Sequence, residues 1–204
     1  MYTAGWCRRT CPKFWRNINE AMRDISLHIL DIVDNSLRAG ASLIRIDITA
    51  DEQQDTLTVT IEDNGSGMSA EMLEKVRSPF TTTRTTRSVG LGIPLLMAGC
   101  ENTGGYLSIE SAPGKGTKLT AVYGMSHIDR PPLGNIAETV ASLVLANPQV
   151  DFVLTVRRDE YFEFDTRMIK DTLQGVPVTE PSVMMFIREY LEEGTVKVLG
   201  GQEI

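Results

Sequence analysis

The chain has 204 residues, of which 42% are hydrophobic, and it carries a formal net charge of −7 at pH 7. A chain of this length buries one good core, either as one domain or as one domain with a small appendage. The negative net charge argues against a broad basic surface for nucleic acid or anionic lipid. No run approaches the roughly 18 to 20 apolar residues that a membrane-spanning helix requires. We therefore expect a soluble protein with no nucleic-acid partner.

The cysteine content and the N-terminal segment indicate the compartment. Three cysteines are too few for a disulfide scaffold, and their odd number suits a reducing compartment, so we expect a cytoplasmic protein. Residues 1–21 open with a basic stretch and lack the apolar core of a secretion signal. We interpret them as a loosely ordered leader, or as the product of a start codon placed upstream of Met22.

From Met22 onward the sequence predicts a long amphipathic helix that ends at Gly40. Its apolar residues recur at spacings of three and four and form one face. The opposite, polar stripe consists of Asp24, His28, Asp31, Asn35 and Arg38. Two alternating runs, residues 44–48 and 57–61, then predict a β-hairpin with one buried face.

The remaining elements predict two α+β units. A short helix over residues 70–76, a polar loop over 78–88 and a helix from about Val89 to Cys100 precede a second hairpin, 106–110 with 118–123. This first unit spans residues 22–125. Beyond the Pro131-Pro132 pair, a helix over 135–146, a hairpin over 151–165 and helices over 167–174 and 182–193 predict a small extension, residues 126–204.

The second strand of the first hairpin runs into Asp63-Asn64-Gly65-Ser66-Gly67. A carboxylate held at this point accepts a hydrogen bond from an exocyclic amine, and two glycines let the backbone approach a flat ligand. The same five residues also fit an ordinary turn, so this motif alone leaves both readings open.

A second motif, Gly90-Leu91-Gly92, follows the polar loop and begins a helix. Free backbone N–H groups at the positive end of a helix bind phosphate. The segment lacks the lysine and the spacing of a Walker A loop, and a plain helix start explains it equally well.

The third feature is the pair Asp31 and Asn35, one helical turn apart on the polar stripe. An amide oxygen suits Mg²⁺, which prefers hard oxygen ligands, and a carboxylate one turn away could orient or deprotonate a water. The alternative is a solvated helix face.

Taken in order along the chain, these motifs resemble the ATP-binding region of the GHKL superfamily, which includes gyrase, heat-shock chaperones, histidine kinases and MutL. The resemblance spans Asp24 to Tyr123 and rests on five elements in the right order. These are Asp31-Ile-Val-Asp-Asn35-Ser-Leu-Arg-Ala-Gly-Ala, Asp63-Asn-Gly-Ser-Gly67-Met, Ser78-Pro-Phe80, Gly90-Leu-Gly92 and Gly114-Lys-Gly-Thr117. It implies a two-layer α/β sandwich of the Bergerat type, in which a mixed, mostly antiparallel sheet carries its helices on one face.

The resemblance also implies roles for individual residues, with ATP and Mg²⁺ as the cofactors. Asn35 would bind Mg²⁺, and Asp63 would accept a hydrogen bond from the adenine amino group. Gly65 and Gly67 would shape the base pocket, and the hydroxyl of Thr117 would support it. The phosphates would meet Gly90, Leu91 and Gly92. Residues 81–88 resemble the lid that closes over ATP, in which Arg84 and Arg87 either contact phosphate or belong to a solvated loop.

The function expected from this pocket depends on Asp31, the candidate catalytic residue. Hydrolytic members of the family usually carry a glutamate at this position, so direct activation of water is in question. We expect a Mg-ATP-binding regulatory protein, either a small protein kinase acting on serine or histidine, like the anti-sigma factor kinases, or a slow ATPase. The alternative is a non-catalytic module that binds a partner in one nucleotide state.

The expected partner is a regulatory or substrate protein, and a homodimer is compatible with the sequence. Residues 1–21 are too short for the helical hairpin that carries the phosphoacceptor of a histidine kinase, and the extension is too short for a transducer domain. We therefore expect a stand-alone or partner-dependent nucleotide module.

Overall fold

A computed structural model describes residues 24–77 and 92–200, so the predicted leader, residues 1–21, lies outside the described residues. The helices are α2 (Ile25–Arg38), α3 (Ala70–Arg77), α4 (Gly92–Asn102), α5 (Ile136–Ala146), α6 (Thr166–Thr172) and α7 (Pro181–Leu199). The strands are β1 (Leu43–Asp51), β2 (Thr56–Asp63), β3 (Tyr106–Ser111), β4 (Thr117–Gly124), β5 (Asp151–Arg157) and β6 (Tyr161–Asp165). Their order along the chain agrees with the predicted order.

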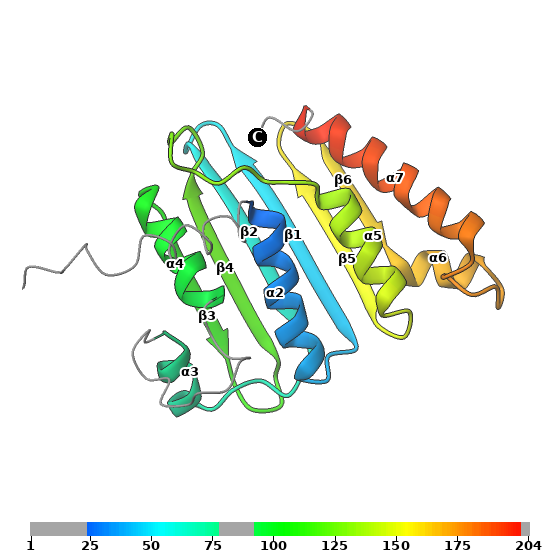
Figure 1. Cartoon of the computed structure of the whole chain (residues 1–204), viewed down its shortest axis with the longest axis horizontal. Helices are drawn as coiled ribbons and strands as arrows, with labels where there is room; N and C mark the ends of the chain where they lie inside the picture. Colours follow the sequence, from blue (N-terminus) through cyan, green and yellow to red (C-terminus); the bar gives the residue numbers. More distant parts are fainter. Residues whose placement is uncertain (1–23, 78–91, 201–204) are drawn as a thin grey trace, which may run out of the picture.

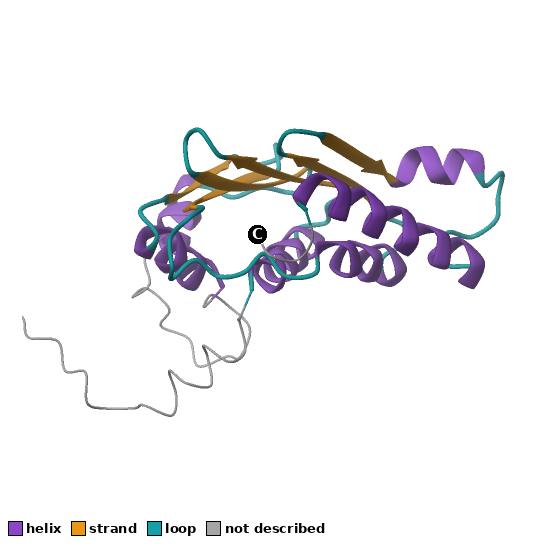
Figure 2. Ribbon diagram, turned by 90° about the horizontal axis from the view of Figure 1, so that it is seen from above, coloured by secondary structure: helices purple, strands orange, loops and turns teal. Residues whose placement is uncertain are grey.

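The strands form one six-stranded sheet in the order β3-β4-β2-β1-β5-β6 (Figure 1). All neighbouring strands are antiparallel except β1 and β5, which are parallel. Helices α2, α4, α5 and α7 lie on one side of the sheet, and α6 continues beyond the end of β6 (Figure 2). The sheet is therefore mixed and mostly antiparallel with its helices on one face, which confirms the predicted α+β fold class.

Helix α2 begins where Asp24 caps it, because the Asp24 carboxylate accepts a hydrogen bond from the backbone N–H of Leu27 at 3.0 Å. Its apolar stripe, which includes Ile25, Ile29, Ile32 and Val33, is buried against the sheet. Gly40 ends the helix with φ +75°, a conformation that glycine adopts without strain. The predicted helix and its end at Gly40 are confirmed, but Asp24, predicted to lie on its polar stripe, is instead the cap that precedes its first residue, Ile25.

The first hairpin follows from the alternation of its residues. Every second residue of β1 and β2 is buried, and the pairing of Ile46 with Ile61 puts both apolar sets on the helix-covered face. The same register carries Asp63 to the end of β2 opposite Ile44. The last residue of β2 is thus a buried carboxylate beside the helix layer.

The extension continues the sheet that the first unit begins. Strand β5 pairs in parallel with β1, and Phe152, Leu154 and Phe164 are buried in the same hydrophobic cluster as α2 and β2. The linker after the first unit is bonded to α2, because the carbonyls of Pro132 and Leu133 accept hydrogen bonds from its first turn. Whether residues 126–204 act as a separate functional unit stays a prediction.

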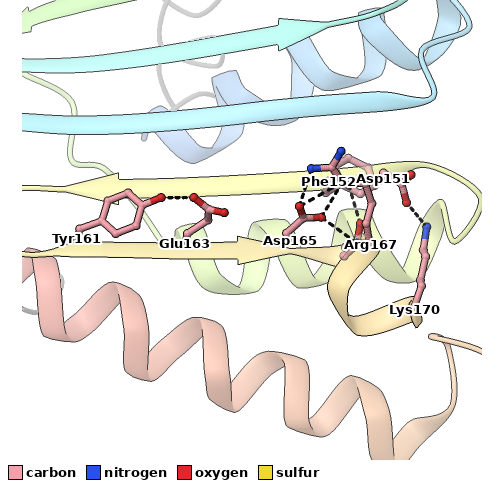
Figure 3. A network of polar contacts seen from close by, with 8 residues as sticks. Asp151, Phe152, Tyr161, Glu163, Asp165, Arg167 and Lys170 are labelled. Atoms are coloured by element: carbon pink, nitrogen blue, oxygen red, sulfur yellow. Dashed lines mark hydrogen bonds and ion pairs between the residues drawn. The ribbon is translucent and has the colours of Figure 1, made fainter. Parts of the chain in front are cut away.

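A network of polar contacts fixes the passage from β6 into α6 (Figure 3). Asp165 caps α6 by accepting a hydrogen bond from the backbone N–H of Arg167 at 2.8 Å, and the Arg167 guanidinium donates hydrogen bonds to both oxygens of the same carboxylate. These bonds lower the pKa of Asp165. Lys170 of α6 reaches Asp151 of β5 at 2.7 Å. The Asp165–Arg167 contacts thus cap α6, and the Lys170–Asp151 contact attaches α6 to β5.

Within residues 24–77 and 92–200, no helix is both long enough and apolar enough to cross a membrane.

Candidate functional site

The carboxylate of Asp63 is buried at the end of β2, with 8% of the residue exposed. Ser36 Oγ donates a hydrogen bond to its Oδ2 at 2.7 Å, and the backbone N–H of Gly65 donates one to its Oδ1 at 2.8 Å. Both donors fix the orientation of the carboxylate, and each of its oxygens keeps further acceptor capacity. Asp63 is therefore an oriented acceptor that selects a hydrogen-bond donor.

Sequence reasoning did not single out Ser36, which is 3% exposed on the buried face of α2. One signal was present in the pattern. Ser36 follows Ile29, Ile32 and Val33 at helical spacing, so it is a polar residue on an apolar stripe. A buried hydroxyl needs a partner, and the Asp63 carboxylate supplies one.

The loop after Asp63 is anchored to the junction of α2 and β1. The side-chain oxygen of Asn64 accepts hydrogen bonds from the backbone N–H groups of Ser42 and Leu43, at 2.8 and 3.0 Å. The N–H of Ser66 binds the carbonyl of Ala39 at 2.9 Å. The loop is held on this side by its own polar groups.

Two glycines let this loop pass close to other backbone. Gly67 has φ +65°, and a Cβ there would lie 2.0 Å from the carbonyl oxygen of Ala112, so no side chain fits. At Gly65 a Cβ would lie 3.0 Å from Ala39 and from Asp63 Oδ1, which is tight. Gly65 thus lies against the Asp63 carboxylate, and Gly67 lies against the backbone of the turn between β3 and β4.

Thr117, the first residue of β4, is the register partner of Asp63 across β2 and β4. Paired residues of neighbouring strands point to the same face, so Thr117 lies on the Asp63 side of the sheet. Its hydroxyl is 3.0 Å from that of Ser111, which also accepts a hydrogen bond from the N–H of Met68 at 2.9 Å. The structure brings Asp63, Gly65, Gly67 and Thr117 together, although 54 positions of sequence separate the first from the last.

The third group of candidates lies where α2 meets the start of α4. Asp31 and Asn35 are exposed on α2, one turn apart. A Cβ on Gly92, the first residue of α4, would lie 3.2 Å from Asp31 Oδ2, so the helix start faces this carboxylate. The other predicted phosphate contacts, Gly90, Leu91, Arg84 and Arg87, and the predicted lid, residues 81–88, lie outside the described residues.

His28 belongs to the polar stripe predicted for α2, but the structure buries it while Asp31 is exposed. His28 is 7% exposed and lines a small apolar cavity with residues of α2, β2, β4 and α4, among them Leu96 and Tyr123. Burial lowers the pKa of His28, while Asp31 and Asp24 act in the opposite direction. In the described part of the chain, His28 Nδ1 has no hydrogen-bond partner.

No group of three or more His, Cys, Asp or Glu side chains in the described ranges is arranged to hold a metal ion by itself. A Mg²⁺ site of the kind predicted at Asn35 has a different composition. It takes one or two protein oxygens, waters and the phosphate oxygens of a bound nucleotide. The exposed amide of Asn35, beside Asp31 and the start of α4, fits that kind of site.

Comparison with known proteins identifies one family. The model of the family described as histidine kinase-, DNA gyrase B- and HSP90-like ATPase matches residues 22–126. The chain is 27% identical over 117 residues to the non-motile and phage-resistance protein of Caulobacter vibrioides, a match that covers 53% of this chain and 14% of that protein. It is 33% identical over 110 residues to the sensor protein kinase FleS of Pseudomonas aeruginosa, covering 54% of this chain and 27% of that protein.

The chain therefore spans less than a third of the length of these relatives. Among solved structures, the MutL ATPase domain of Aquifex aeolicus complexed with ADP aligns with a TM-score of 0.44 and 18% identity. That alignment covers 74% of this chain and 69% of that one.

Proposed function

The chain belongs to the family of histidine kinase-, DNA gyrase B- and HSP90-like ATPases, and from this premise we propose that it is a regulatory protein that binds Mg-ATP beside Asp63. The observation that carries the proposal is the fixed carboxylate of Asp63, with Ser36 and Gly65 as its donors. An oriented carboxylate accepts a hydrogen bond from the exocyclic amino group of adenine. It repels the carbonyl oxygen that guanine presents at the equivalent ring position.

The same geometry supports a place for the phosphates and the metal. Asn35 would offer its amide oxygen to Mg²⁺, and the start of α4 at Gly92 would present backbone N–H groups to phosphate. Both lie on the Asp31 side of α2. Asp63 is bonded to α2 through Ser36, the residue that follows Asn35, so base and metal would lie beside the C-terminal half of this helix.

For the activity we propose transfer of the terminal phosphoryl group to a partner protein, or slow hydrolysis. In either reaction the attacking oxygen or nitrogen forms a bond to the γ-phosphorus, the bond from this phosphorus to the β-γ bridging oxygen breaks, and ADP leaves. Asp31 would orient the attacking group and accept its proton. The exposed Asp31 carboxylate beside the start of α4 supports this role.

The test follows the terminal phosphate. The full chain is incubated with γ-labelled ATP and Mg²⁺, alone and with extract of the source cells, and labelled protein and free phosphate are measured. Labelled protein that appears only with the chain supports a kinase, and free phosphate without extract supports an ATPase. Asp63→Ala should abolish either signal and weaken nucleotide binding at least about 30-fold. The adenine base loses its hydrogen-bond acceptor in this variant, and so do the buried donors Ser36 and Gly65. Unchanged ATP affinity in this variant would contradict the proposed pocket.

A second candidate function is a non-catalytic module whose partner binds in one nucleotide state. Asp31 is one methylene shorter than the glutamate of the resembled hydrolytic enzymes, and this observation favours the module. It predicts ATP binding with neither labelled protein nor free phosphate.

A further inference from the structure

Helix α7 lies along β6 at the outer end of the molecule (Figure 1). One face is buried against β5, β6 and α5 through residues that include Met184, Ile187 and Leu191. The opposite face exposes large apolar side chains between glutamates. We call this face the α7 surface, and it consists of Met185, Phe186, Glu189, Tyr190, Glu193 and Val196.

The aromatic residues of the α7 surface pack against one another and against β6. The Tyr190 ring packs against Phe162 at 5.3 Å and Phe164 at 6.4 Å between ring centroids, and Phe186 stacks on Tyr190 at 6.0 Å with an interplanar angle of 12°. Gly194 permits this packing, because a Cβ there would lie 2.1 Å from the Phe162 ring. Phe186 is nevertheless 56% exposed, so a stacked aromatic ring faces solvent. Rigid aromatic side chains of this kind bind partners at low cost in conformational entropy.

The charge of α7 is unbalanced on this side. Its two cations are committed to acidic residues elsewhere, Arg188 to Glu138 at 3.4 Å and Lys197 to Glu160 at 2.8 Å. Within residues 24–77 and 92–200, no ion pair engages Glu189 or Glu193. Because Phe186, Glu189, Tyr190 and Glu193 recur at helical spacing, the two carboxylates lie in the same stripe as the exposed ring.

The carboxylates of Glu189 and Glu193 beside the exposed Phe186 ring favour one class of binding partner by charge. A symmetric contact with a second copy would bring Glu189 and Glu193 against themselves, in a chain of net charge −7. Anionic lipid and nucleic acid are repelled for the same reason. A basic segment with apolar residues on one side satisfies both the carboxylates and the exposed ring.

We propose that the α7 surface is a docking site for a basic amphipathic helix of a partner protein. Lys or Arg side chains of that helix pair with Glu189 and Glu193, and its apolar stripe covers Phe186 and Met185. The exposed ridge of a long helix, with spacings of three and four, matches the grooves of a second helix. This proposal rests on the proposed function, because it specifies the chemistry of the partner protein. It involves no residue of the nucleotide pocket.

The test uses the full chain and a fluorescent 18-residue amphipathic helical peptide of Lys, Leu and Ala as the probe. In about 0.15 M salt, the double variant Glu189→Lys with Glu193→Lys should weaken binding at least about tenfold, and Phe186→Ala at least about fivefold. The matched control is Glu71→Lys with Glu74→Lys on α3, two exposed glutamates at similar helical spacing, which should stay within about twofold. A peptide with Leu replaced by Ser, at the same charge, should bind as weakly as the wild-type peptide binds the Phe186→Ala variant.

Two results would overturn the proposal. Equal weakening by the α3 control would show binding by net charge alone, and a dimer in sedimentation that Phe186→Ala dissolves would make a second copy the occupant. Asp63→Ala should bind the peptide like the unaltered chain. If the Asp63→Ala variant loses ATP binding but still binds the peptide, the two sites are independent. Failure of the proposed pocket can then be distinguished from failure of the proposed α7 surface. Far-ultraviolet circular dichroism checks that each variant is folded.

Discussion

The hydroxyl of Ser36 lies 2.7 Å from Oδ2 of Asp63 and joins α2 to the end of β2. The donor is one residue beyond Asn35, the predicted Mg²⁺ ligand, and the acceptor is the predicted adenine contact. A single buried hydrogen bond therefore connects the two ends of the proposed nucleotide pocket. A shift of α2 would move both ends together.

Removing this hydroxyl tests the connection. Ser36→Ala leaves Asp63 Oδ2 without its buried donor, so we expect the free energy of unfolding to fall by about 1–2 kcal/mol and ATP affinity to fall about three- to tenfold. Urea unfolding and isothermal titration measure the two effects. Ser142→Ala, an exposed serine of α5, serves as the control and should change neither quantity. Full ATP affinity in a folded Ser36→Ala protein would show that Asp63 needs no such support.

A matched pair of glycine variants tests the loop after Asp63. Gly67 and Gly114 both have positive φ, +65° and +73°, but only at Gly67 would a Cβ meet backbone within 4 Å. We expect Gly114→Ala to cost about 1 kcal/mol from backbone strain alone, and Gly67→Ala to cost more than about 3 kcal/mol because the Ala112 backbone must also move. Thermal unfolding compares them, and equal costs would show that the Ala112 contact is relieved easily.

Replacing Asp31 separates turnover from binding. Asp31→Asn keeps the size of the side chain and removes its basicity, so we expect ATP affinity to change less than about threefold while any phosphate transfer or release falls at least about 100-fold. Phosphate release and nucleotide titration are measured on the same preparation. Unaltered turnover in the variant would remove Asp31 from the chemistry.

The burial of His28 predicts a pH dependence of stability. Because burial lowers the pKa of His28 below its ordinary value of 6.5, the unfolded chain takes up a proton that the folded chain resists. The contribution of neutral His28 to the free energy of unfolding is fully present above about pH 6.5. It is lost as the pH falls toward the pKa of His28 in the folded chain, with a slope of at most about 1.4 kcal/mol per pH unit. Urea unfolding between pH 5 and 7 measures it. His28→Gln should flatten this slope, and an unchanged slope in that variant would show that His28 does not cause it.

Local patterns predicted most of the elements correctly. The alternation in β1 and β2 predicts which residues are buried, because successive side chains of a strand point to opposite faces. The polar stripe predicted for α2 includes His28, but this residue is buried and lines a cavity with Leu96 of α4. Helical periodicity shows which residues share a face of a helix. It does not show how much of that face a second helix will cover in the folded protein.

The sequence by itself determined the helix and strand order and the buried faces, because short-range periodicity and turn chemistry depend on neighbouring residues. The order of its motifs indicated the family through their resemblance to it. Only the tertiary structure decided that β5 pairs in parallel with β1, that Thr117 lies opposite Asp63, and that Ser36 holds the Asp63 carboxylate. These contacts join distant segments. Packing of the whole sheet against its helices selects them, and no local pattern encodes that selection.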